Sequence, residues 1–289
     1  MSLKVGIQLY SVRDSLQADP YGTLEAIAQT GYRYLEAANH NATEDPGVGF
    51  GLSAKEMKTR LDDLGLSIIG SHIFPWQPES LGPVLDYHQE LGNTRIGCAM
   101  EFFPYNDLDH LRRLCDNFNR AGELCKERGM QFYYHNHYHE FQKFGDKNVY
   151  ELLAEYTEAD LVYLELDSYW AARAGVDPLD IIDTYRDRLI LLHQKDFPQD
   201  ASDPLNLYDG IVDPGKNIDF EVFGGSVNPE SFTEIGTGVL PIQDYIDAAN
   251  KAPHLEYIIL EQDHTKLDQL ESIQVSMEAF RKFSGISMG

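Results

Sequence analysis

The sequence predicts one (β/α)₈ barrel, a closed ring of eight parallel strands surrounded by helices. Eight short apolar runs alternate with amphipathic stretches, and most of the runs begin about 30 residues apart, which is the length of one strand–helix unit. No GxGxxG follows the first run and no Walker A sequence occurs, so a doubly wound nucleotide-binding sheet loses its main support. One α/β barrel commonly fills 289 residues, so we expect a single domain over residues 1–289.

The predicted strands are apolar on both faces, as expected of parallel strands that are buried under helices. In chain order they are residues 5–9, 32–35, 66–70, 94–99, 130–134, 161–166, 189–192 and 257–260.

Helix signals fill the segments between these runs. Asp19-Pro20 places a capping carboxylate before a proline at the first helical position. Ser53 and Glu56 have the spacing of a capping box. Gly65 stands where that helix must end before the next strand.

Residues 197–238 form the one long irregular stretch, and they follow the seventh predicted strand. Active sites of such barrels form at the carboxyl ends of the strands, and long loops in compact domains are commonly lids or binding loops. We therefore expect this stretch to cover an active site. A surface excursion or an oligomer contact is the alternative.

Composition excludes several classes of protein. The formal net charge of −24 repels phosphate backbones, so we expect no nucleic acid partner, and it disfavours anionic membrane surfaces. No run of about 18 apolar residues occurs, so no membrane span is expected. Three cysteines (Cys98, Cys115 and Cys125) without CxxC spacing favour reduced thiols and a cytoplasmic protein.

Polar side chains stand where the apolar runs end. In a barrel all these ends meet around one axis, and converging carboxylates need a cation to offset their repulsion. The residues are Gln8, Glu36, His72, His135, Asp167, His193 and Glu261.

The predicted metal ligands are Glu140, Asp167, His193 and Glu261. Three carboxylates and one imidazole suit one divalent ion, with Mn²⁺, Co²⁺ or Mg²⁺ favoured and Zn²⁺ allowed. A histidine of the segment 135–139 is the alternative first ligand. For each residue taken alone, the simpler interpretation is that its side chain caps a strand through a hydrogen bond and binds no metal.

Further residues are expected to contact a substrate. Lys195, two residues beyond His193, either polarises a substrate oxygen or pairs with Asp196. Trp170 offers an aromatic plane for a sugar ring, although packing would explain it equally well. The expected substrate contacts are Gln8, Glu36, His72, His137 and Trp170.

Several motifs, spread from the first predicted strand to the last, carry a family resemblance. They are Gly6-Ile7-Gln8-Leu9-Tyr10-Ser11-Val12-Arg13, Tyr134-His135-Asn136-His137 with Glu140-Phe141, Leu166-Asp167 with Trp170, His193-Gln194-Lys195-Asp196, Glu234-Ile235-Gly236-Thr237-Gly238 and Leu260-Glu261-Gln262-Asp263. With them the chain resembles the sugar phosphate isomerase/epimerase family, which has the xylose isomerase-like TIM barrel.

This resemblance implies a mononuclear metal site with Glu, Asp, His and Glu ligands, which fall on Glu140, Asp167, His193 and Glu261. In epimerase-like members the first glutamate comes directly at the end of the fifth strand. Here that place is occupied by His135, and the nearest glutamate is Glu140.

The expected activity is a metal-dependent proton transfer beside the carbonyl of a sugar or keto-polyol, through an enediolate that the metal stabilises. Glu140 and Glu261 would act as base and acid, while Lys195 and His137 would hold substrate oxygens. Return of the proton gives isomerisation or epimerisation. Loss of a β-oxygen gives the reaction of an inosose dehydratase or of a 3-keto-glycoside lyase.

The expected partner is a small, uncharged sugar or keto-polyol. Phosphate sites use clustered cations or a glycine-rich helix start, whereas Arg13, Arg173, Lys195 and Lys216 are scattered. A sugar-binding barrel without catalysis and the nuclease branch of the superfamily are the rival readings, and the charge argues against the second. Association into a homo-oligomer is left open.

Overall fold

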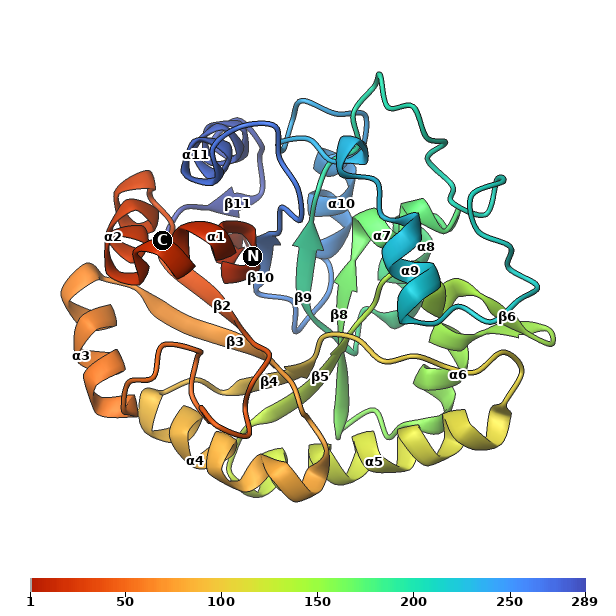
Figure 1. Ribbon diagram of the computed structural model, residues 1–289, viewed down its shortest axis with the longest axis horizontal. Helices are drawn as coiled ribbons and strands as arrows, with labels where there is room; N and C mark the ends of the chain where they lie inside the picture. Colours follow the sequence, from red (N-terminus) through yellow and green to blue (C-terminus); the bar gives the residue numbers. More distant parts are fainter. Residues whose placement is uncertain (1) are drawn as a thin grey trace.

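The computed structural model describes residues 2–289 and shows eight parallel strands closed into a barrel (Figure 1). Pairing of β1 with both β2 and β10 closes the ring, which confirms the predicted fold. The barrel strands are β1 (Leu3–Gln8), β2 (Tyr34–Asn39), β3 (Ser67–Ile73), β4 (Arg95–Cys98), β5 (Gln131–His135), β8 (Val162–Asp167), β9 (Leu189–Gln194) and β10 (Tyr257–Leu260).

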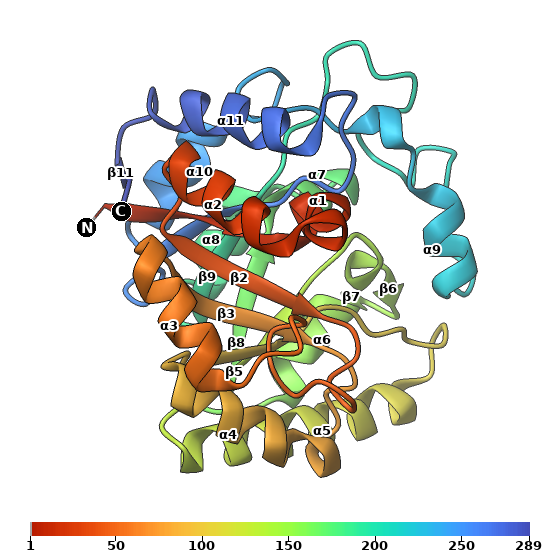
Figure 2. The same cartoon turned by 60° about the vertical axis from the view of Figure 1, so that its left-hand side comes forward.

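Helices surround this ring, and one short helix, over residues 220–226, stands apart from it (Figures 1 and 2). They are α1 (Arg13–Ala18), α2 (Pro20–Thr30), α3 (Ala54–Leu64), α4 (Leu81–Leu91), α5 (Leu108–Glu127), α6 (Val149–Tyr156), α7 (Ser168–Arg173), α8 (Pro178–Tyr185), α9 (Phe220–Ser226), α10 (Ile242–Ala249) and α11 (Gln269–Phe280). The minor elements are the hairpin of β6 (Lys143–Phe144) and β7 (Lys147–Asn148), the strand β11 (Ile286–Ser287) beside β1, and the 3₁₀ turns η1 (Leu9–Val12), η2 (Pro78–Ser80), η3 (His139–Phe141) and η4 (Pro229–Ser231).

Local sequence signals set the helix ends as predicted. Asp19 accepts a hydrogen bond from the Gly22 amide at the start of α2. Ser53 and Glu56 make both bonds of a capping box at the start of α3. That helix ends at Gly65, whose φ of 64° is in the left-handed region that glycine adopts without steric cost.

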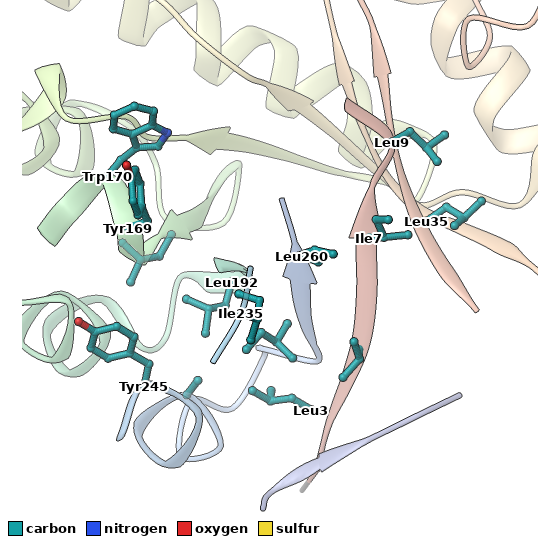
Figure 3. Close-up of a cluster of buried hydrophobic side chains, with 14 of the residues drawn as sticks. Leu3, Ile7, Leu9, Leu35, Tyr169, Trp170, Leu192, Ile235, Tyr245 and Leu260 are labelled. Atoms are coloured by element: carbon teal, nitrogen blue, oxygen red, sulfur yellow. The ribbon is translucent and has the colours of Figure 1, made fainter. Parts of the chain in front are cut away.

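The apolar core fills the space between the strands and the surrounding helices. Figure 3 shows part of it, with Ile7 of β1 beside Leu260 of β10, its partner in the strand pairing. All three cysteines are buried among apolar side chains, and none forms a disulfide within residues 2–289.

The stretch 197–238 leaves the carboxyl end of β9 and includes the short helix α9, so it is less irregular than predicted. In Figure 2, α9 lies on the side to which β2 points, opposite the two termini. The buried Asp196 carboxylate fixes the start and the end of the stretch, because it accepts hydrogen bonds from the amides of Phe197, Gly238 and Leu240. The role of the stretch as an active-site cover stays a prediction.

Within residues 2–289, no helix has both the length and the apolar character that a membrane span requires.

Candidate metal centre

The carboxyl ends of four consecutive barrel strands supply a compact group of metal donors. His135 ends β5, Asp167 ends β8, His193 lies in β9, and Glu261 follows β10 directly. One donor atom from each residue lies within 4.8 Å of the others. The exposed fraction is 7% for Glu261 and at most 1% for the other three. One ion could therefore touch all four side chains, which we call the upper cluster.

Lys195 lies against the upper cluster. Its ammonium donates to the carboxylates of Asp167 and Glu261, and it lies 5.8 Å from the centre of the Trp170 ring. The second oxygen of Asp167 accepts from the Trp170 amide at 2.8 Å, which fixes the carboxylate as the cap of α7. Of the two roles expected of Lys195, pairing with Asp196 is wrong, because within residues 2–289 the Asp196 carboxylate accepts only backbone amides.

A second group, the lower cluster, lies deeper in the barrel and consists of Gln8, Glu36, His72 and Glu165. Glu165 accepts from His72 Nε2 at 2.6 Å and from His135 Nδ1 at 3.0 Å. Glu36 accepts from Gln8 Nε2 at 2.9 Å, and its Oε2 lies 2.5 Å from His193 Nε2. Exposure of these four residues is at most 4%, so the lower cluster is sealed from solvent.

The charged groups of the two clusters control one another's pKa values. Burial alone would lower the pKa of His193 and of Lys195, but the carboxylates around them hold both well above their ordinary values. Burial alone would raise the pKa of Glu165 and of Glu261, yet the surrounding cations hold both well below. Just beyond, burial raises the pKa of Asp263 to about 7. A site with these properties stabilises added positive charge.

The donor set fits a divalent ion. Asp167 and Glu261 offer carboxylate oxygens and His135 and His193 offer imidazole nitrogens, a mixture that suits Mn²⁺, Co²⁺ or Zn²⁺. The side chains converge from separate strands, so the barrel holds the donors in place.

Three of the four predicted ligands come together, and Glu140 does not join them. The Glu140 carboxylate accepts from Tyr134 Oη at 2.6 Å and from the His137 amide at 2.8 Å. His135, the histidine at the end of β5, supplies the fourth donor instead. A 3₁₀ turn over residues 139–141 carries Glu140 away from the strand end, and the sequence did not reveal that turn.

Glu165 is the buried carboxylate that sequence reasoning missed. A signal was present, because Glu165 precedes Asp167 by two residues on one strand and side chains two apart in a strand point to the same face. Its apolar neighbours Leu164 and Leu166 conceal this signal, because the run 161–166 resembles an uninterrupted apolar strand.

The predicted substrate contacts lie in two different places. Gln8, Glu36 and His72 belong to the lower cluster, beneath the donors. His137 and Trp170 lie near Phe223 of α9, with ring centres 5.1 and 5.8 Å from it. His137 Nδ1 and Trp170 Nε1 are buried, and neither has a hydrogen-bond partner within residues 2–289. The second pair is therefore better placed to receive a ligand.

Comparison with known proteins identifies relatives of this chain. The sequence model of the family described as xylose isomerase-like TIM barrel matches residues 24–283. Inosose dehydratase of Lacticaseibacillus casei is 28% identical over 172 residues, which cover 58% of this chain and 53% of that protein. The chain thus spans about half the length of the curated relatives that it matches.

Solved structures show the same fold over nearly the whole chain. A sugar phosphate isomerase/epimerase from Parabacteroides distasonis superposes with a TM-score of 0.78, covering 99% of this chain and 96% of its own, at 24% identity. The IOLI protein with a binding zinc atom superposes with a TM-score of 0.67, covering 98% of this chain and 100% of its own, at 13% identity.

Proposed function

Because this chain belongs to the xylose isomerase-like TIM barrel family, we propose that it is an enzyme that uses one divalent metal ion to move a proton beside the carbonyl of a sugar or keto-polyol. The observation that carries the proposal is the convergence of His135, Asp167, His193 and Glu261 in a buried group next to Lys195. A bound ion would supply Lewis acidity to the substrate oxygens.

The side chains around the donors have distinct proposed roles. Glu261 is the most exposed of the donors, so it is the carboxylate best placed to take the carbon-bound proton. Lys195 directs its ammonium at the same region and holds the substrate oxygen on which negative charge develops. His137 Nδ1, which is buried and unpartnered within residues 2–289, accepts or donates a hydrogen bond to a substrate hydroxyl.

Elimination of water from a keto-polyol is the outcome that we favour. The curated relatives reported above are named inosose dehydratases, and elimination begins with the same proton abstraction as isomerisation. The group that leaves is the hydroxyl on the carbon next to the one that loses its proton. Isomerisation or epimerisation, which returns the proton to carbon, is the second candidate, because it needs no residue beyond those already placed.

An uncharged substrate agrees with how the nearby cations are engaged. Arg13 donates to the Asp263 carbonyl at 2.7 Å, and Arg173 donates to the Pro204 carbonyl at 2.8 Å. Lys216 lies beside Asp213 at the surface. None of these cations gathers with Lys195 into a phosphate site.

The first test replaces Glu261 by Gln. The variant keeps the side-chain volume but removes the charge, so turnover should fall by about 10²–10⁴-fold, as expected for loss of a general base. Proton NMR in D₂O, with inososes and ketoses as substrates and Mn²⁺ or Co²⁺ added, reports deuterium uptake and product together. A product that has lost one water, either the enol or the 1,2-diketone that it forms with deuterium at the former hydroxyl-bearing carbon, indicates elimination, whereas deuterium at the neighbouring carbon of an isomer indicates isomerisation.

Glu256→Gln is the matched control. Glu256 immediately precedes β10, at its amino end, where it pairs with Lys4 and Arg95 at the surface. That variant should turn over at the wild-type rate. Removal of metal with a chelator should abolish the wild-type reaction, and added ion should restore it. Full turnover by Glu261→Gln, or by chelated protein, would refute the proposed function.

A further inference from the structure

We propose that Glu165 and Glu36 are positioning residues, which hold the rings of His135 and His193 so that each presents one chosen nitrogen to the metal ion. This inference rests on the proposed function and adds the machinery beneath the metal site. The two imidazole rings join the upper cluster to the lower cluster, and their contacts support the inference.

Each ring has one nitrogen in the upper cluster and one in the lower. His193 Nδ1 lies 3.0 Å from Glu261, and its Nε2 lies 2.5 Å from Glu36. His135 is turned the other way, with Nε2 3.9 Å from Asp167 and Nδ1 3.0 Å from Glu165. The two histidines should therefore bind the ion through different nitrogens, Nδ1 of His193 and Nε2 of His135.

The lower carboxylates are well suited to fix this choice. A histidine that binds a metal usually donates its other N–H to a carboxylate or carbonyl, which sets the tautomer and the ring orientation. Glu36 and Glu165 are both fully buried, so solvent does not compete for the bond. A neutral imidazole that binds a metal through one nitrogen keeps a proton on the other. The remaining N–H of His135 would then donate to Glu165, and that of His193 would donate to Glu36.

The lower carboxylates are themselves held in place. Glu165 accepts from His72 Nε2 as well as from His135. Glu36 accepts from the Gln8 amide and from the Tyr133 hydroxyl. These supporting contacts come from β1, β3 and β5, and they give the buried polar side chains of the early strands hydrogen-bond partners.

A second metal ion in the lower cluster is the competing explanation. His72, His135, Glu165 and His193 also have donor atoms within 4.8 Å of one another. If both clusters held ions at once, His135 and His193 would each lose both ring protons and become bridging imidazolates. One ion above and two N–H···carboxylate bonds below require neutral rings only, which is the ordinary state of a metal-bound histidine.

The variant Glu165→Gln tests the role of the lower carboxylate. It should weaken Co²⁺ binding by about 10–100-fold, the usual effect of losing such an outer partner, and should alter the visible absorption spectrum of the bound Co²⁺. Isothermal titration measures affinity and stoichiometry, and circular dichroism checks folding. Glu36→Gln should act in the same direction through His193.

Glu140→Gln is the matched control for metal affinity. Glu140 is as buried as Glu165, but it accepts hydrogen bonds from Tyr134 and from a backbone amide instead of from a donor histidine in the upper cluster. The Co²⁺ affinity of this variant should stay within about twofold of wild type. A carboxylate outside the donor set affects metal affinity by holding a metal ligand in place, and Glu140 holds none of the four donors.

The unaltered protein provides a test that does not depend on a variant folding. With ¹⁵N-labelled histidine and bound ¹¹³Cd²⁺, coupling to cadmium should appear at His135 Nε2 and His193 Nδ1, with none at His72. Coupling at His72, or two cadmium ions per chain, would overturn the proposal in favour of a metal site in the lower cluster.

The outcomes separate the two proposals. If the wild-type protein binds Co²⁺ and exchanges substrate protons while Glu165→Gln binds as tightly, only the positioning role fails. If the wild-type protein binds no metal, both proposals fail.

Discussion

The histidines of this chain show how the neighbours of a buried ring decide its charge. His193 is surrounded by carboxylates, which raise its pKa well above the ordinary value although burial acts to lower it. Burial lowers the pKa of His137 well below the ordinary value, and the neighbouring His135, His139 and Lys195 lower it further. His88 is a buried residue of α4 and belongs to neither cluster, and burial lowers its pKa to about 4.

Acid should destabilise the fold through His88. Its pKa is about 4 in the folded chain and 6.5 in the reference state, so between these pH values the unfolded chain binds more protons. The free energy of unfolding should therefore fall by about 2 kcal/mol from this residue alone as the pH drops from 7 to 5.

Urea unfolding of wild type and His88→Asn at both pH values measures this contribution. The asparagine removes the titrating group and keeps an acceptor near Asn93 Nδ2, which lies 3.0 Å from His88 Nδ1. The wild-type protein should lose about 2 kcal/mol more than the variant between pH 7 and 5. Equal losses would show that His88 does not titrate in this range on unfolding.

Among the elements, β4 and β5 show how a small residue makes room for a polar interior. Tyr133 points into the barrel, where its hydroxyl donates to Glu36. A Cβ atom on Gly97 of β4, paired with Tyr133 in register, would lie 2.3 Å from the Tyr133 ring. Glycine is thus required at position 97, because any side chain there would clash with the Tyr133 ring.

Gly97→Ala should destabilise the protein by about 1–3 kcal/mol, the usual cost of overpacking a dense interior. Gly224→Ala is the control, because its Cβ would meet nothing within 4 Å and it lies in α9, where alanine is favoured by up to about 1 kcal/mol over glycine. Chemical denaturation should show the two variants shifted in opposite directions. Unchanged stability of Gly97→Ala would mean that the Tyr133 ring moves aside without cost.

For the whole molecule, net charge and barrel closure have opposite effects on stability. The net charge of −24 disfavours compaction through repulsion among surface carboxylates. The closed ring of strands, joined by β1 and β10, buries the core in one unit, and β11 adds a contact between the last residues and the first strand.

Added salt should therefore stabilise the protein. The screening length falls from about 30 Å at 10 mM to about 8 Å at 150 mM, which weakens the long-range repulsion more than the close contacts inside the barrel. Calorimetry should show a melting temperature that rises by roughly 2–5 °C over this range. Tetramethylammonium chloride in place of NaCl controls for specific cation binding. A falling melting temperature would show that surface ion pairs outweigh the repulsion.

The sequence by itself determined the order of strands and helices, because hydrophobic period and capping are local properties of the chain. The eight apolar runs became the eight barrel strands, and Ser53 with Glu56 capped α3 as predicted. It also placed Asp167, His193 and Glu261 at strand ends, where barrel topology alone brings them together.

Only the tertiary structure decided which residue completes the donor set and how the rings are turned. Glu140 and His135 are five residues apart, and a 3₁₀ turn determines which of them faces the axis. The partner of Glu165 lies 93 residues away in His72. Such pairings depend on strand register and side-chain direction across the barrel, and a linear pattern records neither.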